Sequence, residues 1–190
     1  MPAFGASDKL EKAWGVEEYA EWLKSFLIQT GAYGADIIAH SFGARVAILA
    51  LSNDSSLCDK LIITGGAGIV KPRSPEYMRR VKRYRRIKKL FPKFAERHFG
   101  SEEYKSLSPL MKESYKKIVN RDLRAEAAKI SNPTLLIYGQ DDSVTPVGEE
   151  GATFLSLIKG SKLVTMQGDH FCFMSYPERF NSLVLEFLKG

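Results

Sequence analysis

The sequence predicts an α/β fold, a mostly parallel sheet flanked by helices, from three observations. Short apolar runs suited to buried strands recur along the chain, and amphipathic helical patterns lie between or after them. One segment, residues 71–123, breaks this alternation because it carries helical and highly charged sequence without a strand pattern. Strands that alternate with helices pair in parallel and have both faces of their sheet covered.

The first helix is predicted at residues 16–29. Tyr19, Trp22 and Phe26 recur there at steps of three and four residues, with acidic residues early and a lysine later. That spacing places the apolar side chains on one face of a helix.

Four apolar runs predict the strands. The first ends at Ile38 and passes through a tight turn into a buried helical stretch. The second, at 60–68, breaks at two glycines, and the third, at 132–139, is opened by a proline. The fourth, at 162–166, has the weakest pattern.

Two further helices are predicted around 148–158 and at 177–188, where a proline in the first turn suits a helix start. We expect residues 1–70 and 124–190 to form the core of one domain. Residues 71–123 are then an insertion over the sheet, a basic helical cap or lid. The length of 190 residues and the 44% hydrophobic content are ordinary for a single domain.

The composition bears on location and redox state. No apolar run approaches the ~18 to 20 residues of a membrane span, and the N-terminus lacks the features of a signal peptide. We therefore expect a cytoplasmic protein. Cys58 and Cys172 are too few for a disulfide framework or a cysteine metal site, so we expect both to be reduced and structural, and no metal site is predicted.

The positive charge of the chain is local. The net charge is +6, but residues 71–98 hold twelve lysines and arginines against Glu76 and Glu96, a local charge of +10. The remainder therefore carries −4. A charge this concentrated describes one segment and not the whole surface.

Residues 39–43, Ala-His-Ser-Phe-Gly, differ from the nucleophile-elbow pattern G-x-S-x-G only in having alanine for the first glycine. The pattern needs small neighbours because its serine sits on a strained turn from a strand into a helix, with the hydroxyl exposed at the carboxyl edge of the sheet. An apolar run precedes Ser41 and a helical stretch follows it. Ser41 is therefore the predicted nucleophile.

A serine nucleophile needs a base that takes its proton and an acid that orients the base. Gly139–Pro146 follows the third predicted strand and holds Asp141 and Asp142, and Gly168–Phe171 follows the fourth and holds His170. The carboxyl ends of neighbouring parallel strands meet at one edge of an open sheet. The order serine, acid, histidine therefore predicts a catalytic triad at this edge.

His170 is the expected base because His40 lies inside the elbow and His98 inside the basic segment. His40 is a candidate for the substrate pocket. The favoured alternative for His40 is packing behind the site or a hydrogen bond to the backbone.

Together these segments resemble the α/β-hydrolase superfamily of esterases, lactonases and carbon–carbon bond hydrolases. The matching features are PAFGAS at 2–7, the AHSFGAR elbow at 39–45, the GxxDxxxP loop at 139–146 and GDH at 168–170. The resemblance implies that Asp142 is the triad acid, with Asp141 as its competitor and more suited to capping the loop. It also implies that the backbone amide of Phe42 is one donor of the oxyanion hole.

The resemblance covers nearly the whole chain but only the later two-thirds of the family's domain. The opening strands, and the loop that would supply the second oxyanion donor, have no counterpart after Met1. The strand before Ser41 would then lie at an open sheet edge that invites another strand. Three explanations stay open: a truncated sequence, which is favoured, one half of a split enzyme completed by another chain, or a compact chain that forms a homodimer through this edge.

Residues 77–94 have the pattern of a basic amphipathic helix, with aromatic and aliphatic residues at steps of three and four and cations between them. Such a helix can cap a pocket, lie on an anionic membrane surface or bind nucleic acid. Its position after the second strand favours the cap; membrane contact is less favoured and nucleic acid least. In a cap, Tyr77, Tyr84 and Phe91 are candidates to line an acyl or aromatic pocket.

The expected function is a serine hydrolase, carboxylesterase-like, that cleaves a small ester, thioester or lactone through Ser41, His170 and Asp142. The sequence calls for no metal or organic cofactor, because nucleophile, base and acid come from the chain. A carbon–carbon bond hydrolase would use the same triad. The alternative is a catalytically impaired fragment or a binding module that uses the basic helix on membrane or nucleic acid.

Overall fold

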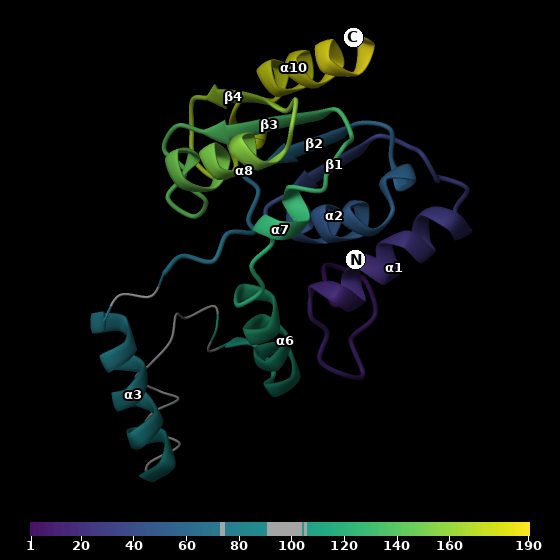
Figure 1. Ribbon diagram of the computed structural model, residues 1–190. Coiled ribbons are helices and arrows are strands. Elements are labelled where there is room, and N and C mark those ends of the chain that lie inside the picture. Colours follow the sequence, from purple (N-terminus) through teal and green to yellow (C-terminus); the bar gives the residue numbers. More distant parts are fainter. Residues whose placement is uncertain (73–74, 91–103, 105) are drawn as a thin grey trace.

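The computed structural model describes residues 1–72, 75–90, 104 and 106–190, and it confirms the predicted fold class (Figure 1). Neighbouring strands of the sheet are paired in parallel throughout the described residues. In spatial order these strands are β1 (Ile37–His40), β2 (Leu61–Thr64), β3 (Thr134–Gly139) and β4 (Lys162–Met166). Each of the four apolar runs therefore forms a strand, including the weakest of them.

Helices cover both faces of the sheet, as an α/β fold requires (Figure 1). One face packs against α1 (Val16–Gln29), α2 (Phe42–Asn53), α7 (Arg124–Ala127) and α8 (Ala152–Leu157). The other face packs against α9 (Cys172–Ser175) and α10 (Pro177–Lys189). The helices predicted at 16–29 and 177–188 are thus confirmed almost to the residue. The one predicted around 148–158 is a π-helical turn at Val147–Gly151 followed by α8.

Two apolar cores lie on either side of the sheet because successive residues of a strand point to opposite faces. Leu61 and Ile63 of β2 belong to the core with α1 and α2, whereas Ile62 between them packs toward α10. All residues of β2 and β3 are buried. These two runs are apolar almost without a break because both faces of the central strands are covered.

β1 lies at an edge of the sheet and, within the described residues, pairs with β2 alone. The amide of Ile37 donates to Lys60 O, so the amides of the alternate residues of β1 point away from β2. Ile38 is 52% exposed, although Ile62, its partner in β2, is fully buried. The strand that leads to Ser41 therefore has an open edge and an exposed apolar side chain.

The strand register brings the loops after the strands to one level. His40 at the end of β1 pairs with Thr64 at the end of β2, and Thr64 pairs with Ile137 of β3. β3 continues to Gly139, which pairs with Met166 at the end of β4. Ser41, Gly65 and the loops after Gly139 and Met166 thus begin at the same edge of the sheet.

The segment at 71–123 is helical where the structure describes it, with α3 (Pro75–Leu90) and α6 (Pro109–Val119). Pro109 and the Ser108 side chain, which accepts from the Met111 amide, start α6. The end of this segment is tied to the core by Arg45 of α2, which donates to the carbonyls of Ile118 and Arg121. In Figure 1, α3 lies away from the sheet, beyond α6. The division into a core and a cap stays a prediction.

Both cysteines are buried and neither forms a disulfide. Burial raises the pKa of Cys58 to about 12 and also raises that of Cys172, so both thiols stay protonated at neutral pH. Among the described residues no helix combines the length and the apolar character needed to span a bilayer.

Candidate active site

Ser41 occupies the turn between β1 and α2 with φ 50° and ψ −111°. This conformation is strained for any residue with a side chain, as in a nucleophile elbow. The turn is held from two sides, since the Ser41 amide donates to Thr64 O (3.1 Å) and the Ser41 carbonyl accepts from Ala67 N (3.2 Å). Alanine at position 39 fits, because a Cβ placed on Gly43 would meet the Ala39 methyl at an ordinary 3.9 Å.

Phe42, the expected oxyanion donor, is the first residue of α2. Amides in the first turn of a helix have no carbonyl partner within that helix, so the Phe42 amide is a donor at the end of the elbow. The Phe42 ring stacks on Phe4 at 5.5 Å and meets Tyr19 edge-on at 5.1 Å. The N-terminal PAFGAS segment therefore packs directly behind the elbow.

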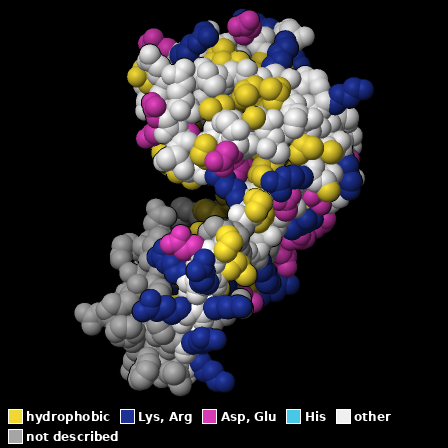
Figure 2. Space-filling model, turned by 60° about the vertical axis from the view of Figure 1, so that its left-hand side comes forward, with side chains coloured by type: hydrophobic (Ala, Val, Ile, Leu, Met, Phe, Trp, Pro, Cys, Tyr) yellow, Lys and Arg dark blue, Asp and Glu magenta, His cyan; other side chains and the backbone are white. Residues whose placement is uncertain are grey.

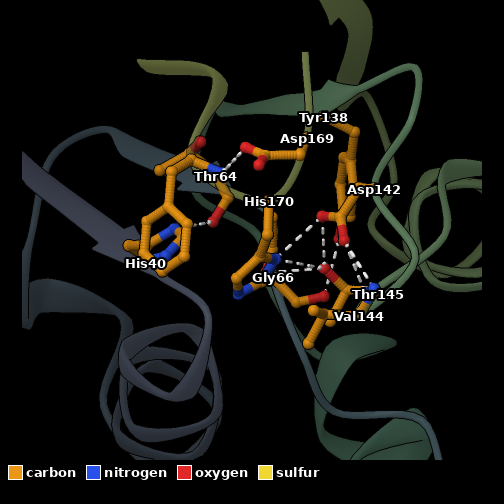
Figure 3. A network of polar contacts seen from close by, with 11 residues as sticks. His40, Thr64, Gly66, Tyr138, Asp142, Val144, Thr145, Asp169 and His170 are labelled. Atoms are coloured by element: carbon orange, nitrogen blue, oxygen red, sulfur yellow. Dashed lines mark hydrogen bonds and ion pairs between the residues drawn. The ribbon is translucent and has the colours of Figure 1, made fainter. Parts of the chain in front are cut away.

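Asp142 lies in the loop after β3 and is almost fully buried (Figure 3). Its Oδ1 accepts from the amides of Val144 (2.9 Å) and Thr145 (2.8 Å). Its Oδ2 accepts from His170 Nδ1 (2.8 Å) and lies 2.8 Å from the Thr145 hydroxyl oxygen. Asp141 is exposed and does not reach the histidine; its amide donates to Gly168 O (3.0 Å). The structure thus places Asp142, and not Asp141, against His170.

The hydrogen bonds to Asp142 decide its charge. Burial raises the pKa of this carboxyl, but the Thr145 amide, His170 and the Thr145 hydroxyl together outweigh burial, so that the pKa falls below its ordinary value. Asp142 is therefore an anion at neutral pH. An anionic acceptor at Nδ1 requires the imidazole to carry its proton there.

His170 follows β4 and is 7% exposed. Because its Nδ1 proton is donated to Asp142, the neutral ring has its lone pair on Nε2, the nitrogen that can act as a base. Among the described residues, no hydrogen bond joins the Ser41 hydroxyl to His170. Catalytic hydrogen bonds are often loose without substrate and tighten in the substrate complex.

Gly139, the glycine of the acid loop, permits the loops after β3 and β4 to pack together. A Cβ at this position would lie 2.1 Å from Asp169 O and 2.4 Å from Gly168 O. No side chain fits there, so only glycine lets the acid loop approach the histidine loop this closely. This contact explains why the first residue of the GxxD pattern is a glycine.

His40 lies beside the hydrogen-bonded pair of His170 and Asp142. Its Nδ1 donates to Thr64 O (3.0 Å), and its ring lies 4.7 Å from that of His170 and 4.8 Å from that of Phe173. Burial lowers the pKa of His40, and the neighbouring His170 lowers it further. A backbone hydrogen bond and packing were the favoured sequence interpretation of His40, and this geometry fits both.

The end of β2 carries a set of contacts that the sequence analysis missed. Three successive carbonyls there accept hydrogen bonds from three different elements: Thr64 O from the Ser41 amide, Gly65 O from the Thr145 hydroxyl (3.0 Å) and Gly66 O from the Tyr138 hydroxyl (2.9 Å). Figure 3 shows this corner, with His170 between His40 on one side and Asp142 and Thr145 on the other. The pair of glycines after the apolar run was the only signal of it in the sequence.

The cap residues predicted to line a pocket remain to be tested. Tyr84 is partly buried in α3, and the side chain of Tyr77 and all of Phe91 lie outside the described residues. The assignment of these three residues to a substrate pocket stays a prediction.

Comparison with known proteins agrees with this fold. Residues 1–183 match the model of the Alpha/beta hydrolase family. The chain belongs to this family. A solved esterase from Exiguobacterium antarcticum superposes on the whole chain with a TM-score of 0.73 at 20% identity, and the chain covers 79% of it. At this identity the similarity of α/β-hydrolase structures shows the fold alone.

Two curated relatives are more informative about sequence. A pimeloyl-[acyl-carrier protein] methyl ester esterase of Nitrosomonas europaea is 38% identical over 61 residues, which is 32% of this chain and 24% of the esterase. The AB hydrolase superfamily protein YisY of Bacillus subtilis is 26% identical over 211 residues, which covers 98% of this chain and 78% of YisY. The chain thus spans about a quarter of the length of the esterase, and most of the length of YisY.

Proposed function

We propose that this α/β hydrolase cleaves a small ester, thioester or lactone through a triad of Ser41, His170 and Asp142. The observation that carries the proposal is the buried contact between His170 Nδ1 and Asp142 Oδ2 at 2.8 Å. It lies at the same sheet edge as a serine with φ 50° at the start of a helix. An acid, a base and a strained serine in this arrangement support acyl transfer.

In the proposed reaction, the Ser41 oxygen attacks the substrate carbonyl while its proton moves to His170 Nε2. The Phe42 amide donates to the oxyanion that forms, and Asp142 stabilises the imidazolium. The proton then passes to the leaving alcohol or thiol, which leaves an acyl group on Ser41. Water, deprotonated by His170, releases the acid and restores the serine. Every group that moves a proton comes from the chain, so these steps need no cofactor.

The names of two relatives support the proposed substrate class. The Nitrosomonas europaea protein is named as a methyl ester esterase and the Exiguobacterium antarcticum structure as an esterase. A second candidate reaction is favoured by another neighbour, a meta-cleavage product hydrolase from Pseudomonas fluorescens with a TM-score of 0.71. We therefore propose ester hydrolysis first and carbon–carbon bond hydrolysis as the competing activity. Turnover of p-nitrophenyl esters against vinylogous diketones separates the two.

The test of the triad is labelling of the purified chain by a fluorophosphonate probe. Ser41→Ala and His170→Ala should each abolish labelling, whereas Ser143→Ala, which alters an exposed serine beside Asp142, should leave it unchanged. Circular dichroism checks that each variant is folded. A folded wild type that takes no label, or a label that survives Ser41→Ala, would show that the triad does not work in this chain.

We further propose that the open edge of β1 binds another polypeptide, either a second copy of the chain or a chain that completes the sheet. The support is the unpaired side of β1 and the exposed Ile38. Ile38→Lys should shift sedimentation from dimer to monomer, whereas Leu185→Lys, at an equally exposed leucine of α10, should not. A chain that sediments as a monomer, and that no added strand-bearing fragment binds, would contradict the proposal.

A second candidate function rests on α3. Among the described side chains of α3, six cations are exposed. Figure 2 shows Lys and Arg side chains gathered on the lower part of the molecule, where α3 lies. The six exposed cations are Arg79, Arg80, Lys82, Arg83, Arg86 and Lys89. A cationic surface of this kind attracts anionic lipids, so we propose that it binds an anionic membrane. Nucleic acid is the competing ligand. Cosedimentation with anionic but not with zwitterionic vesicles tests it, and Arg79→Glu/Arg83→Glu/Arg86→Glu should abolish binding while ester turnover persists.

A cytoplasmic location is proposed with both functions, and fluorescence microscopy of a tagged chain checks it.

A further inference from the structure

Thr145 makes more contacts with the catalytic pair than any role in closing a loop requires. It is 3% exposed. Its amide donates to Asp142 Oδ1 (2.8 Å), and its hydroxyl oxygen lies 2.8 Å from Asp142 Oδ2 and 3.2 Å from His170 Nδ1. The same oxygen lies 3.0 Å from Gly65 O. One buried side chain thus contacts the acid, the base and the end of β2 together.

The hydroxyl has a single proton, and its neighbours determine what that proton can do. Gly65 O and Asp142 Oδ2 are both acceptors, so the proton goes to one of them, while the nitrogen at 3.2 Å is a donor when it carries its proton. A hydroxyl that donates to the Gly65 carbonyl presents its lone pairs to the Nδ1 proton. The alternative, in which the hydroxyl donates to a bare Nδ1, would favour the tautomer with the proton on Nε2.

Gly65 is held in the position that this geometry requires. Its amide donates to Ile137 O (2.9 Å), which fixes the glycine to β3. Its φ is +51°, and a Cβ on it would lie 3.1 Å from His170 Nδ1 and 3.3 Å from Asp142 Oδ2. The carbonyl that anchors Thr145 therefore belongs to a backbone segment that is itself pressed against the catalytic pair.

We infer that Thr145 is a positioning residue of the acid–base pair. Its amide orients the Asp142 carboxylate. Its hydroxyl, which donates to the Gly65 carbonyl, offers its oxygen as a second acceptor to the imidazole proton of His170 and keeps that proton on Nδ1, so that Nε2 stays free to act as the base. The kinetic consequence rests on the proposed triad. The position of the proton does not, because the acid, the histidine and the threonine are in contact whether or not Ser41 reacts.

The experiment separates the hydroxyl from the methyl group of Thr145. Thr145→Ser keeps the hydroxyl, Thr145→Val replaces it with a methyl of similar size, and Thr145→Ala removes both. Thr153→Val, at a half-buried threonine of α8 whose hydroxyl donates to Glu149 O, is the matched control. The readouts are the rate of fluorophosphonate labelling and the 15N spectrum of the imidazoles, which gives the share of each tautomer. His170→Ala assigns the signals among the three histidines of the chain.

If the hydroxyl positions the pair, the serine variant should match wild type, and the valine and alanine variants should both label about tenfold more slowly, as loss of one hydrogen bond implies. In these two variants the share of the Nδ1-protonated tautomer of His170 should also fall. The inference is wrong if valine matches wild type while serine behaves like alanine, because the methyl would then be what counts. It is equally wrong if His170 of the wild type is protonated on Nε2. A wild type without any labelling would remove the proposed function, and the 15N spectra would still decide the role of Thr145.

Discussion

The acid–base side of the candidate site and its nucleophile side are held in different ways. Asp142 and His170 follow β3 and β4, are both nearly buried, and have hydrogen-bond partners on the loops around them. Ser41 follows β1 at the open edge of the sheet and is half-buried. Its backbone is tied to Thr64 and Ala67, and within the described residues its hydroxyl has no hydrogen bond to His170.

The difference shows which part of the site the fold already organises before substrate binds. The acid–base pair is fixed by contacts that exist without substrate, so changes there should act on proton transfer. The serine is held in a strained conformation by backbone hydrogen bonds at the end of an edge strand, so changes there should also affect stability.

Asp142→Asn should have the largest effect, a loss of about 10⁴-fold in ester turnover or labelling rate. An asparagine can donate its amide proton to Nδ1 and so favour the tautomer in which Nε2 carries a proton and cannot act as a base. Asp141→Asn, at the exposed neighbour, should change the rate less than about twofold. Equal losses in the two variants would remove the distinction between these aspartates.

Gly65→Ala should destabilise the fold by about 2 to 4 kcal/mol, because backbone strain at positive φ adds to crowding against His170. Gly31→Ala is the matched control: its φ is +70°, but a Cβ there meets nothing within 4 Å, so only the strain of about 1 to 2 kcal/mol remains. Urea denaturation measures both free energies of unfolding. If the two losses were the same, the end of β2 would not be packed tightly against the acid–base pair.

Ser41→Gly should be more stable than Ser41→Ala by about 1 kcal/mol, although we expect neither variant to take the fluorophosphonate label. Glycine adopts the φ of 50° at this turn without the clash that alanine keeps. Thermal unfolding of the two variants gives the difference directly. A more stable alanine variant would mean that the elbow is not strained in solution.

His40→Gln should give the smallest effect, a shallower fall of stability with acidity. Burial and the adjacent His170 lower the pKa of His40, while Asp142 acts in the opposite direction. In the unfolded chain this histidine therefore takes up a proton near pH 6.5, whereas in the folded chain it stays neutral to a lower pH. The free energy of unfolding of the wild type is accordingly higher above pH 6.5 and falls below it. Glutamine can still donate to Thr64 O but does not titrate. Urea titrations at pH 7 and pH 5 should show less than about 1 kcal/mol of difference between the two proteins, and a steeper fall in the variant would contradict it.

Local patterns in the sequence were enough to predict the strands and several helices. The run at 132–139 forms β3 (Thr134–Gly139), and the proline-led pattern at 177–188 forms α10. They could be read because burial on both faces of a parallel sheet leaves a continuous apolar run, and burial of one helix face leaves a period near 3.6. The order of the three site loops also followed from the sequence, since parallel strands deliver their carboxyl ends to one edge.

Thr145 and Gly65 could not be found in this way. They are 80 residues apart in the sequence. Neither the pattern of the acid loop nor that of the glycines after β2 indicates that these two residues are in contact. Their contact depends on the register that sets Thr64 opposite Ile137. A shift of one residue would turn the side chains of the strand to the other face and move these carbonyls away from the acid loop.

Local sequence patterns were sufficient to predict the fold class, the positions of the strands, and a serine, an acid and a histidine at the ends of these strands. The family resemblance had already selected Asp142 over Asp141, and packing was the favoured interpretation of His40; the structure places Asp142 against His170 and the His40 ring beside it. Packing in three dimensions was needed to show that the carbonyls after β2 hold the elbow and the acid loop. The difference arises from the distance along the chain over which each interaction acts. Burial and periodicity act on neighbours along the chain, whereas hydrogen bonds between loops depend on distances that only the packed sheet sets.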